Sequence, residues 1–146
     1  MKKDLTLRWI NRDKGINVDT STISGKYLDF NISGQSLKEY LGITKDSSVT
    51  PFGWFLNKNE QSKALKEFRL QTKPHLPDNR IEVYICDECG HIGCGSVTAQ
   101  IHDKGDKIVW AKFARQHNSD EVSSLFDVED LEFERTSYFA ALAAIK

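Results

Sequence analysis

The chain of 146 residues is long enough to bury one hydrophobic core, so we expect a single domain over residues 1–146. Hydrophobic residues make up 39%, and no run approaches the roughly 20 apolar residues that a membrane span needs, so we expect a cytoplasmic protein without a signal peptide. The net charge of −1 combines a balance of +5 over residues 1–75 with −6 over residues 76–146, and the sequence lacks the clustered basic residues of a nucleic-acid-binding protein.

Two segments near the N-terminus alternate between apolar and polar residues, as half-buried strands do. Residues 5–10 place Leu5, Leu7 and Trp9 on one face, and residues 27–32 alternate in the same way. We expect the two segments to pair as antiparallel strands with these apolar faces toward the core.

Two helices are predicted between these strands and the second half of the chain. Ser36 and Glu39 form a capping box, and Gly42 takes the position where a short helix ends in a left-handed conformation. A second helix over residues 60–70 has an apolar stripe, and its charged side chains, Glu67 among them, are expected to face solvent.

An aromatic cluster at residues 52–55 lies between these helices. Pro51 and Gly53 favour a loop at this position. The loop either packs its rings into the core or presents them as a wall that binds a ligand.

The second half of the chain predicts a three-stranded meander, with strands at residues 80–86, 96–102 and 107–115. Residues 103–106 form a hairpin turn in which Gly105 can adopt a positive φ. The third strand has apolar residues on both faces near its start, so we expect it to be a central strand that is covered on both sides.

A final helix is expected after an acidic segment, with Thr136 or Ser137 as its N-cap. Together the elements predict an α+β domain. We expect an antiparallel sheet of about five strands, made of the N-terminal pair and the three-stranded meander, packed against two or three helices.

The acidic segment before the final helix has two interpretations. It is either a solvated connection or a docking surface for a basic protein partner, because clustered acidic side chains steer the association of a positively charged protein. The docking interpretation assigns six carboxylates to the partner-binding surface: Asp120, Glu121, Asp127, Glu129, Asp130 and Glu132.

All three cysteines lie within nine residues, at the turn between the first two strands of the meander. Their odd number and close spacing argue against a disulfide framework and for a reducing compartment. Cys86 and Cys89 have the spacing of a zinc half-site, to which Cys94 can add a third thiolate and His91 the fourth ligand. The alternatives are a thiol redox site, and small buried cysteines that bind nothing beneath a glycine-rich turn. More distant candidates for the fourth ligand are His75, His102 and His117.

The strand-turn-strand segment around these cysteines resembles a family of small uncharacterised bacterial proteins. Their pattern is Y-x-C-P-E-C-G-D-x-G-C-G-A-x-T followed by a G-D-x-V-x-W strand, and residues 83–98 and 105–110 of this chain are similar to it. The chain departs from the pattern at Asp87, His91 and Ser96. Since the family has Asp at the position of His91, the resemblance implies that a histidine ligand there is not a shared feature. The resemblance implies no activity.

The sequence contains no phosphate-binding loop, dinucleotide fingerprint or zinc-protease motif, so we do not expect an enzyme. Charge and size favour a non-catalytic bacterial protein-binding protein, most concretely an immunity protein that neutralises a nuclease-type toxin through its acidic surface. The alternative is a zinc- or thiol-dependent module that uses Cys86, Cys89 and Cys94. In that alternative, one structural Zn²⁺ is the expected cofactor. No nucleic acid or membrane is expected as a partner.

Overall fold

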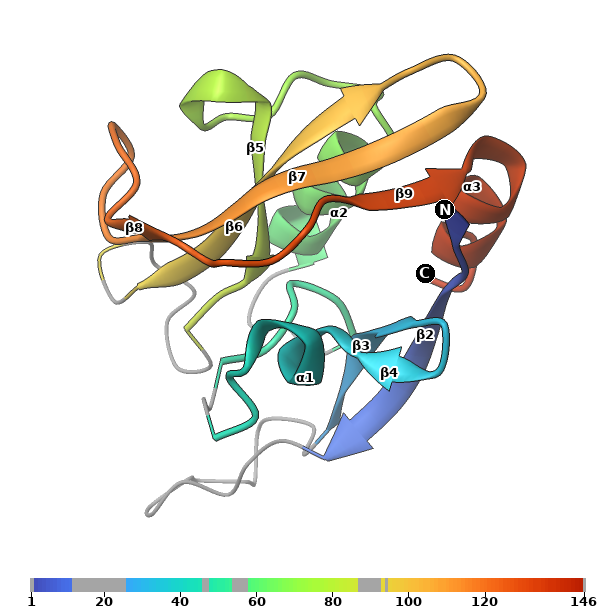
Figure 1. Cartoon of the computed structure of the whole chain (residues 1–146), viewed down its shortest axis with the longest axis horizontal. Helices are drawn as coiled ribbons and strands as arrows, with labels where there is room; N and C mark the ends of the chain where they lie inside the picture. Colours follow the sequence, from blue (N-terminus) through green and yellow to red (C-terminus); the bar gives the residue numbers. More distant parts are fainter. Residues whose placement is uncertain are drawn as a thin grey trace.

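The computed structural model describes residues 2–11, 26–45, 48–53, 58–86, 93 and 95–145. These residues form an α+β fold of two sheets and three α-helices (Figure 1). The predicted fold class is therefore confirmed, but the five expected strands belong to two sheets rather than one. The helices are α1 (Leu37–Leu41), α2 (Lys58–Phe68) and α3 (Arg135–Leu142).

The larger sheet has six strands, in the order β1-β9-β7-β6-β5, with β8 paired to β7. It is mixed, because β1 runs parallel to β9 while the other pairs are antiparallel. The central strand β7 is buried on both faces near its start, as predicted. The strands of the larger sheet are β1 (Lys2–Lys3), β5 (Arg80–Tyr84), β6 (Ser96–Asp103), β7 (Lys107–Gln116), β8 (Ser124–Leu125) and β9 (Leu131–Glu134).

The smaller sheet is antiparallel and holds the N-terminal strand pair. Its strands are β2 (Leu5–Asn11), β3 (Lys26–Ile32) and β4 (Gln35–Ser36). The expected inward position of Trp9 is wrong, because the side chain of this residue is 57% exposed. Its ring lies against the backbone of Gly53, where a Cβ would be only 2.9 Å from Trp9 Cζ3. The absence of a side chain at Gly53 therefore allows this close approach of the Trp9 ring.

The helix ends follow local side-chain chemistry. Ser36 caps α1 and Gly42 ends it with a φ of 76°, both as expected, but the Ser36 hydroxyl accepts the backbone N–H of Lys38, at 3.1 Å, and not that of Glu39 as in the predicted capping box. The expected cap of α3 is wrong by two or three residues. The Glu134 carboxylate accepts the backbone N–H groups of Thr136 and Ser137 at 2.8 and 3.0 Å, so Glu134 caps the helix itself.

Aromatic side chains from both sheets and from the helices form the centre of the core. The ring of Phe30 in β3 lies 5.7 Å from that of Phe68 in α2 and 5.1 Å from that of Trp110 in β7. Phe52 is fully buried against Phe68, with ring centroids 5.0 Å apart, so this part of the aromatic loop packs into the core. The rest of that loop, residues 54–55, lies outside the described residues.

Glu67 is an exception to the predicted helix pattern, because it is only 8% exposed. Its carboxylate binds the connector that follows α2: Oε2 accepts the backbone N–H of His75 at 3.2 Å and lies 2.9 Å from the ring Nδ1. The other ring nitrogen of His75 lies 3.2 Å from Glu82 Oε1 on β5. A histidine eight residues away therefore explains a buried glutamate that helical periodicity places in solvent.

No helix in the described part of the chain is long and apolar enough to span a membrane. The longest, α2, has 11 residues, about half of what a span requires.

We call the contacts of His75 with Glu67 and Glu82 the His75 clamp. This clamp predicts a specific dependence of stability on pH. Hydrogen bonds to Glu67 and then to Glu82 raise the pKa of His75 from 6.5 to about 10. A raised folded-state pKa means that the stabilisation is complete below pH 6.5 and is lost as the pH rises toward 10. In urea unfolding, His75→Gln should lower the free energy of unfolding by about 1 kcal/mol at pH 6, a modest value because solvent screens the 60% exposed side chain. The difference from wild type should shrink toward zero near pH 10. A difference that stays constant or grows with pH would contradict this clamp.

Candidate functional site

The acidic residues lie on an extended segment that leaves the end of β7 and runs along the sheet to β9 (Figure 1). We call residues 120–130 the acidic strap. A tight turn begins it, in which Asn118 Oδ1 accepts the backbone N–H groups of Asp120 and Glu121 at 2.9 and 3.1 Å. The strap then forms β8, which pairs with β7 in the antiparallel direction. The strands β8 and β9 were not predicted, because β8 has only two residues and the acidic side chains of β9 are depleted in strands and hide its pattern.

Side chains of the strap alternate between the core and solvent. Phe126 and Val128 are half-buried and pack against the main core, whereas Leu125, Asp127 and Glu129 are exposed. Leu125 is 61% exposed and is one of two large hydrophobic side chains that lie open to solvent among the described residues. The outward side of the strap therefore combines an apolar side chain with two carboxylates.

Hydrogen bonds hold the strap against the rest of the molecule. The backbone N–H of Phe126 donates to the carbonyl of Phe113 at 2.8 Å, and the Tyr40 hydroxyl of α1 donates to the carbonyl of Glu129 at 2.7 Å. Burial, followed by the charges of Glu129 and Asp130, raises the pKa of Tyr40, so its hydroxyl keeps its proton at neutral pH. A segment fixed in this way loses little conformational entropy when a partner binds.

Five of the six predicted carboxylates are exposed on the strap, and the sixth, Glu132, lies on β9. Lys107 Nζ contacts Glu132 Oε1 at 3.1 Å, and this hydrogen bond lowers the pKa of Glu132. Lys107 therefore offsets the charge of Glu132 locally. The guanidinium of Arg115 lies beside the strap, 5.3 Å from the ring centroid of Phe126. The five exposed carboxylates leave the strap negatively charged.

The cysteine turn, residues 86–95, begins at the end of β5. Cys86 is half-buried and follows Ile85, whose backbone N–H and C=O pair with Val49 at 2.7 and 3.0 Å. Three of the four predicted zinc ligands lie outside the described residues: Cys89, His91 and Cys94. Within the part of the chain that the structure describes, no group of three His, Cys, Asp or Glu side chains is arranged to hold a metal ion.

The ends of three strands meet at the cysteine turn: Cys86 follows β5, Gly95 precedes β6 and His117 follows β7. The antiparallel register of β6 and β7 brings His117 beside Gly95. His117 Nε2 lies 3.3 Å from the position that a Cβ would take on Gly95, while Nδ1 lies 2.8 Å from Ser123 Oγ. Of the more distant ligand candidates His75, His102 and His117, it is His117 whose ring lies beside Gly95, at the end of the cysteine turn.

A buried carboxylate that the sequence did not single out joins the two sheets next to this turn. Asp29 of β3 is 2% exposed and accepts hydrogen bonds from Tyr84 Oη at 2.6 Å, Ser36 Oγ at 2.8 Å and the backbone N–H of Phe30 at 2.9 Å. Burial first, and then the charge of Asp29, raise the pKa of Tyr84 well above its ordinary value. This cross-link fixes the end of β5, where the cysteine turn begins.

No protein-family model matches the chain, and neither a curated protein sequence nor a solved structure shows significant similarity to it. The resemblance to the small bacterial proteins with the cysteine turn therefore stays a prediction.

Proposed function

We propose that the chain is a non-catalytic protein-binding protein whose acidic strap binds a positively charged protein. The observation that supports this proposal is the outward side of the strap, where exposed Leu125 lies next to Asp127 and Glu129 on a pre-organised segment. Apolar contacts surrounded by polar and charged groups are the usual composition of a protein interface. Asp120 and Glu121 extend the negative charge and would speed the encounter with a cationic partner.

In its most concrete form, the partner is a bacterial toxin with a nuclease-type active site, and the chain is the immunity protein that neutralises it in the cytoplasm. A nuclease attracts phosphate groups with Lys and Arg side chains, so its substrate groove carries the charge that the strap complements. Covering that groove requires no catalytic group in the immunity protein. The partner to test is the protein encoded beside the gene.

Neutralising the strap should weaken the complex with that partner. The triple variant Asp127→Asn, Glu129→Gln and Asp130→Asn should raise the dissociation constant about ten- to a hundredfold, mainly through slower association, and the effect should diminish in high salt. Leu125→Ala should raise the dissociation constant about tenfold, mainly through faster dissociation, because the lost contact is apolar. Surface plasmon resonance gives both rate constants.

A matched control removes the same charge elsewhere. Glu60→Gln, Asp78→Asn and Asp106→Asn neutralise three exposed carboxylates outside the strap, and this variant should bind within about threefold of wild type. The proposal fails if no complex forms, if the toxin still kills cells that co-express the chain, or if the control weakens binding as much as the strap variant.

A second candidate function, the zinc-dependent module, is supported by the position of His117. Its Nε2 lies beside the cysteine turn, so it can complete a tetrahedral site with the thiolates of Cys86, Cys89 and Cys94. A hydrogen bond from Nδ1–H to Ser123 Oγ would fix the tautomer that leaves Nε2 available for a metal. In this candidate, one structural Zn²⁺ links the ends of β5, β6 and β7.

The zinc candidate predicts about one zinc ion per chain in protein purified without a tag. His117→Ala should weaken zinc binding at least about tenfold in a chelator competition, while His91→Ala and the control His102→Ala should not. A zinc content near zero, with no loss of thermal stability in chelator, would exclude the module. Loss of zinc in His91→Ala but not in His117→Ala would place the fourth ligand within the turn.

A further inference from the structure

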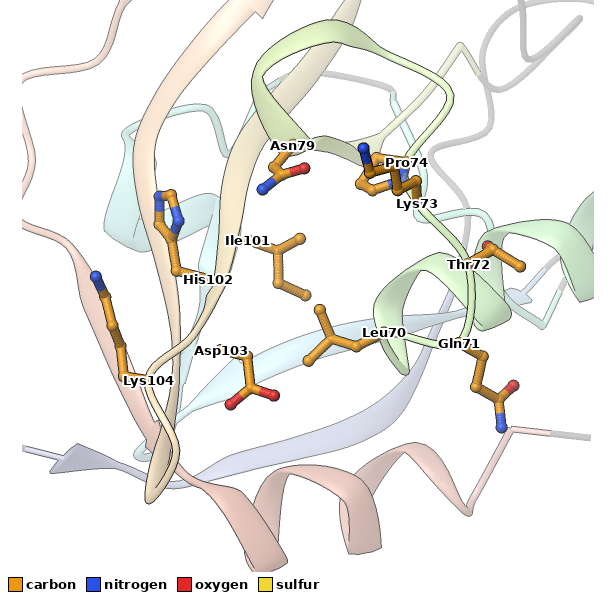
Figure 2. Close-up of a pocket in the computed structure, with 10 residues that line it drawn as sticks. All are labelled: Leu70, Gln71, Thr72, Lys73, Pro74, Asn79, Ile101, His102, Asp103 and Lys104. Atoms are coloured by element: carbon orange, nitrogen blue, oxygen red, sulfur yellow. The ribbon is translucent and has the colours of Figure 1, made fainter.

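A pocket of about 450 Å³ lies between the connector after α2 and the C-terminal end of β6 (Figure 2). Residues 70–74 form one wall, residues 101–104 form the other, and Asn79 closes one side. The volume is within the range of small-molecule sites, which is roughly 300–1,000 Å³. Among the described residues of the strap and of the cysteine turn, none lines it.

The connector wall is held in place at both ends. At its start, Leu70 has a φ of 62°, and the backbone N–H of Gln71 donates to the carbonyl of Lys66 at 2.9 Å. Glycine usually occupies this helix-ending position, so the side chain of Leu70 must be held by its packing against the core. At the other end, the His75 clamp binds the connector to Glu67 and β5. The pocket is therefore already formed without a ligand.

The lining combines an apolar floor with cations at the rim. Figure 2 shows Leu70 and Ile101 pointing toward each other at the centre, with Lys73 and Lys104 on opposite sides. Ile101 is only 2% exposed, whereas both lysines are exposed, and neither forms an ion pair with another described residue. Two ammonium groups without an ion pair among the described residues, above half-buried Leu70 and buried Ile101, favour a ligand that is both anionic and apolar.

The one carboxylate in the lining does not cancel this charge. Asp103 Oδ1 accepts hydrogen bonds from Arg135 Nη1 at 2.5 Å and from the backbone N–H of Gly105 at 2.9 Å. The hydrogen bond with Arg135 lowers the pKa of Asp103, so the carboxylate is ionised and its charge is paired with that of the Arg135 guanidinium. The remaining polar groups include the amides of Gln71 and Asn79, which can donate to an anion.

We propose that this pocket binds a small aromatic carboxylate. The ring lies on the half-buried side chain of Leu70, with Ile101 beneath it, and the carboxylate accepts charge-assisted hydrogen bonds from Lys73 or Lys104. This site is independent of the acidic strap, so either proposal can fail without the other.

A titration with benzoate, followed by the ¹H–¹⁵N NMR spectrum of the whole chain, tests the site. Benzoate should shift the amide signals of residues 70–74 and 101–104 along saturable curves, with a dissociation constant of roughly 1–10 mM. Benzamide has the same shape without the charge and should bind about tenfold more weakly. The variant Lys73→Ala with Lys104→Ala should lose affinity about tenfold.

The matched control replaces two exposed lysines outside the pocket, Lys45→Ala and Lys63→Ala, and should bind benzoate like wild type. Three results would overturn the proposal. They are shifts that do not saturate or that spread over other surfaces, equal affinity for benzamide, and unchanged affinity in the variant without Lys73 and Lys104.

Discussion

Trp110 connects the two sheets and two of the helices in one core. Its fully buried indole packs edge-on against Phe30 of the smaller sheet, Phe68 of α2 and Phe133 of β9, with ring centroids 5.1, 5.7 and 5.0 Å away. The indole N–H donates to Tyr138 Oη of α3 at 3.3 Å, and that hydroxyl donates to the carbonyl of Phe68 at 2.8 Å. A buried indole needs such a partner for its N–H, so one side chain constrains where both helices lie.

The β6–β7 hairpin around Trp110 separates the candidate sites. At one end, the acidic strap pairs with the last residues of β7, and His117 reaches the cysteine turn. At the other end, the last residues of β6 and the hairpin turn supply one wall of the pocket. No described residue of the strap lines the pocket, so we expect partner binding and ligand binding to act independently.

Local signals in the sequence were sufficient for the fold class. Caps such as Ser36 and Gly42, and the period-two patterns, act over a few residues and predicted α1 and the longer strands correctly. Contacts between distant segments were not predictable, because nothing near Glu67 indicates that a histidine on the following connector will bury it. At the candidate site, composition identified the carboxylates. The inward Phe126 was hidden by its acidic neighbours, and the position of His117 depends on the register between β6 and β7.

The central claim is that a protein partner covers the acidic strap. Hydrogen exchange of backbone amides, measured on the chain alone and in complex with the protein encoded beside its gene, tests this claim most directly. We predict slower exchange across residues 118–130 in the complex and unchanged exchange at residues 70–74 and 101–104. Protection of the pocket or of the cysteine turn, with no change at the strap, would contradict it.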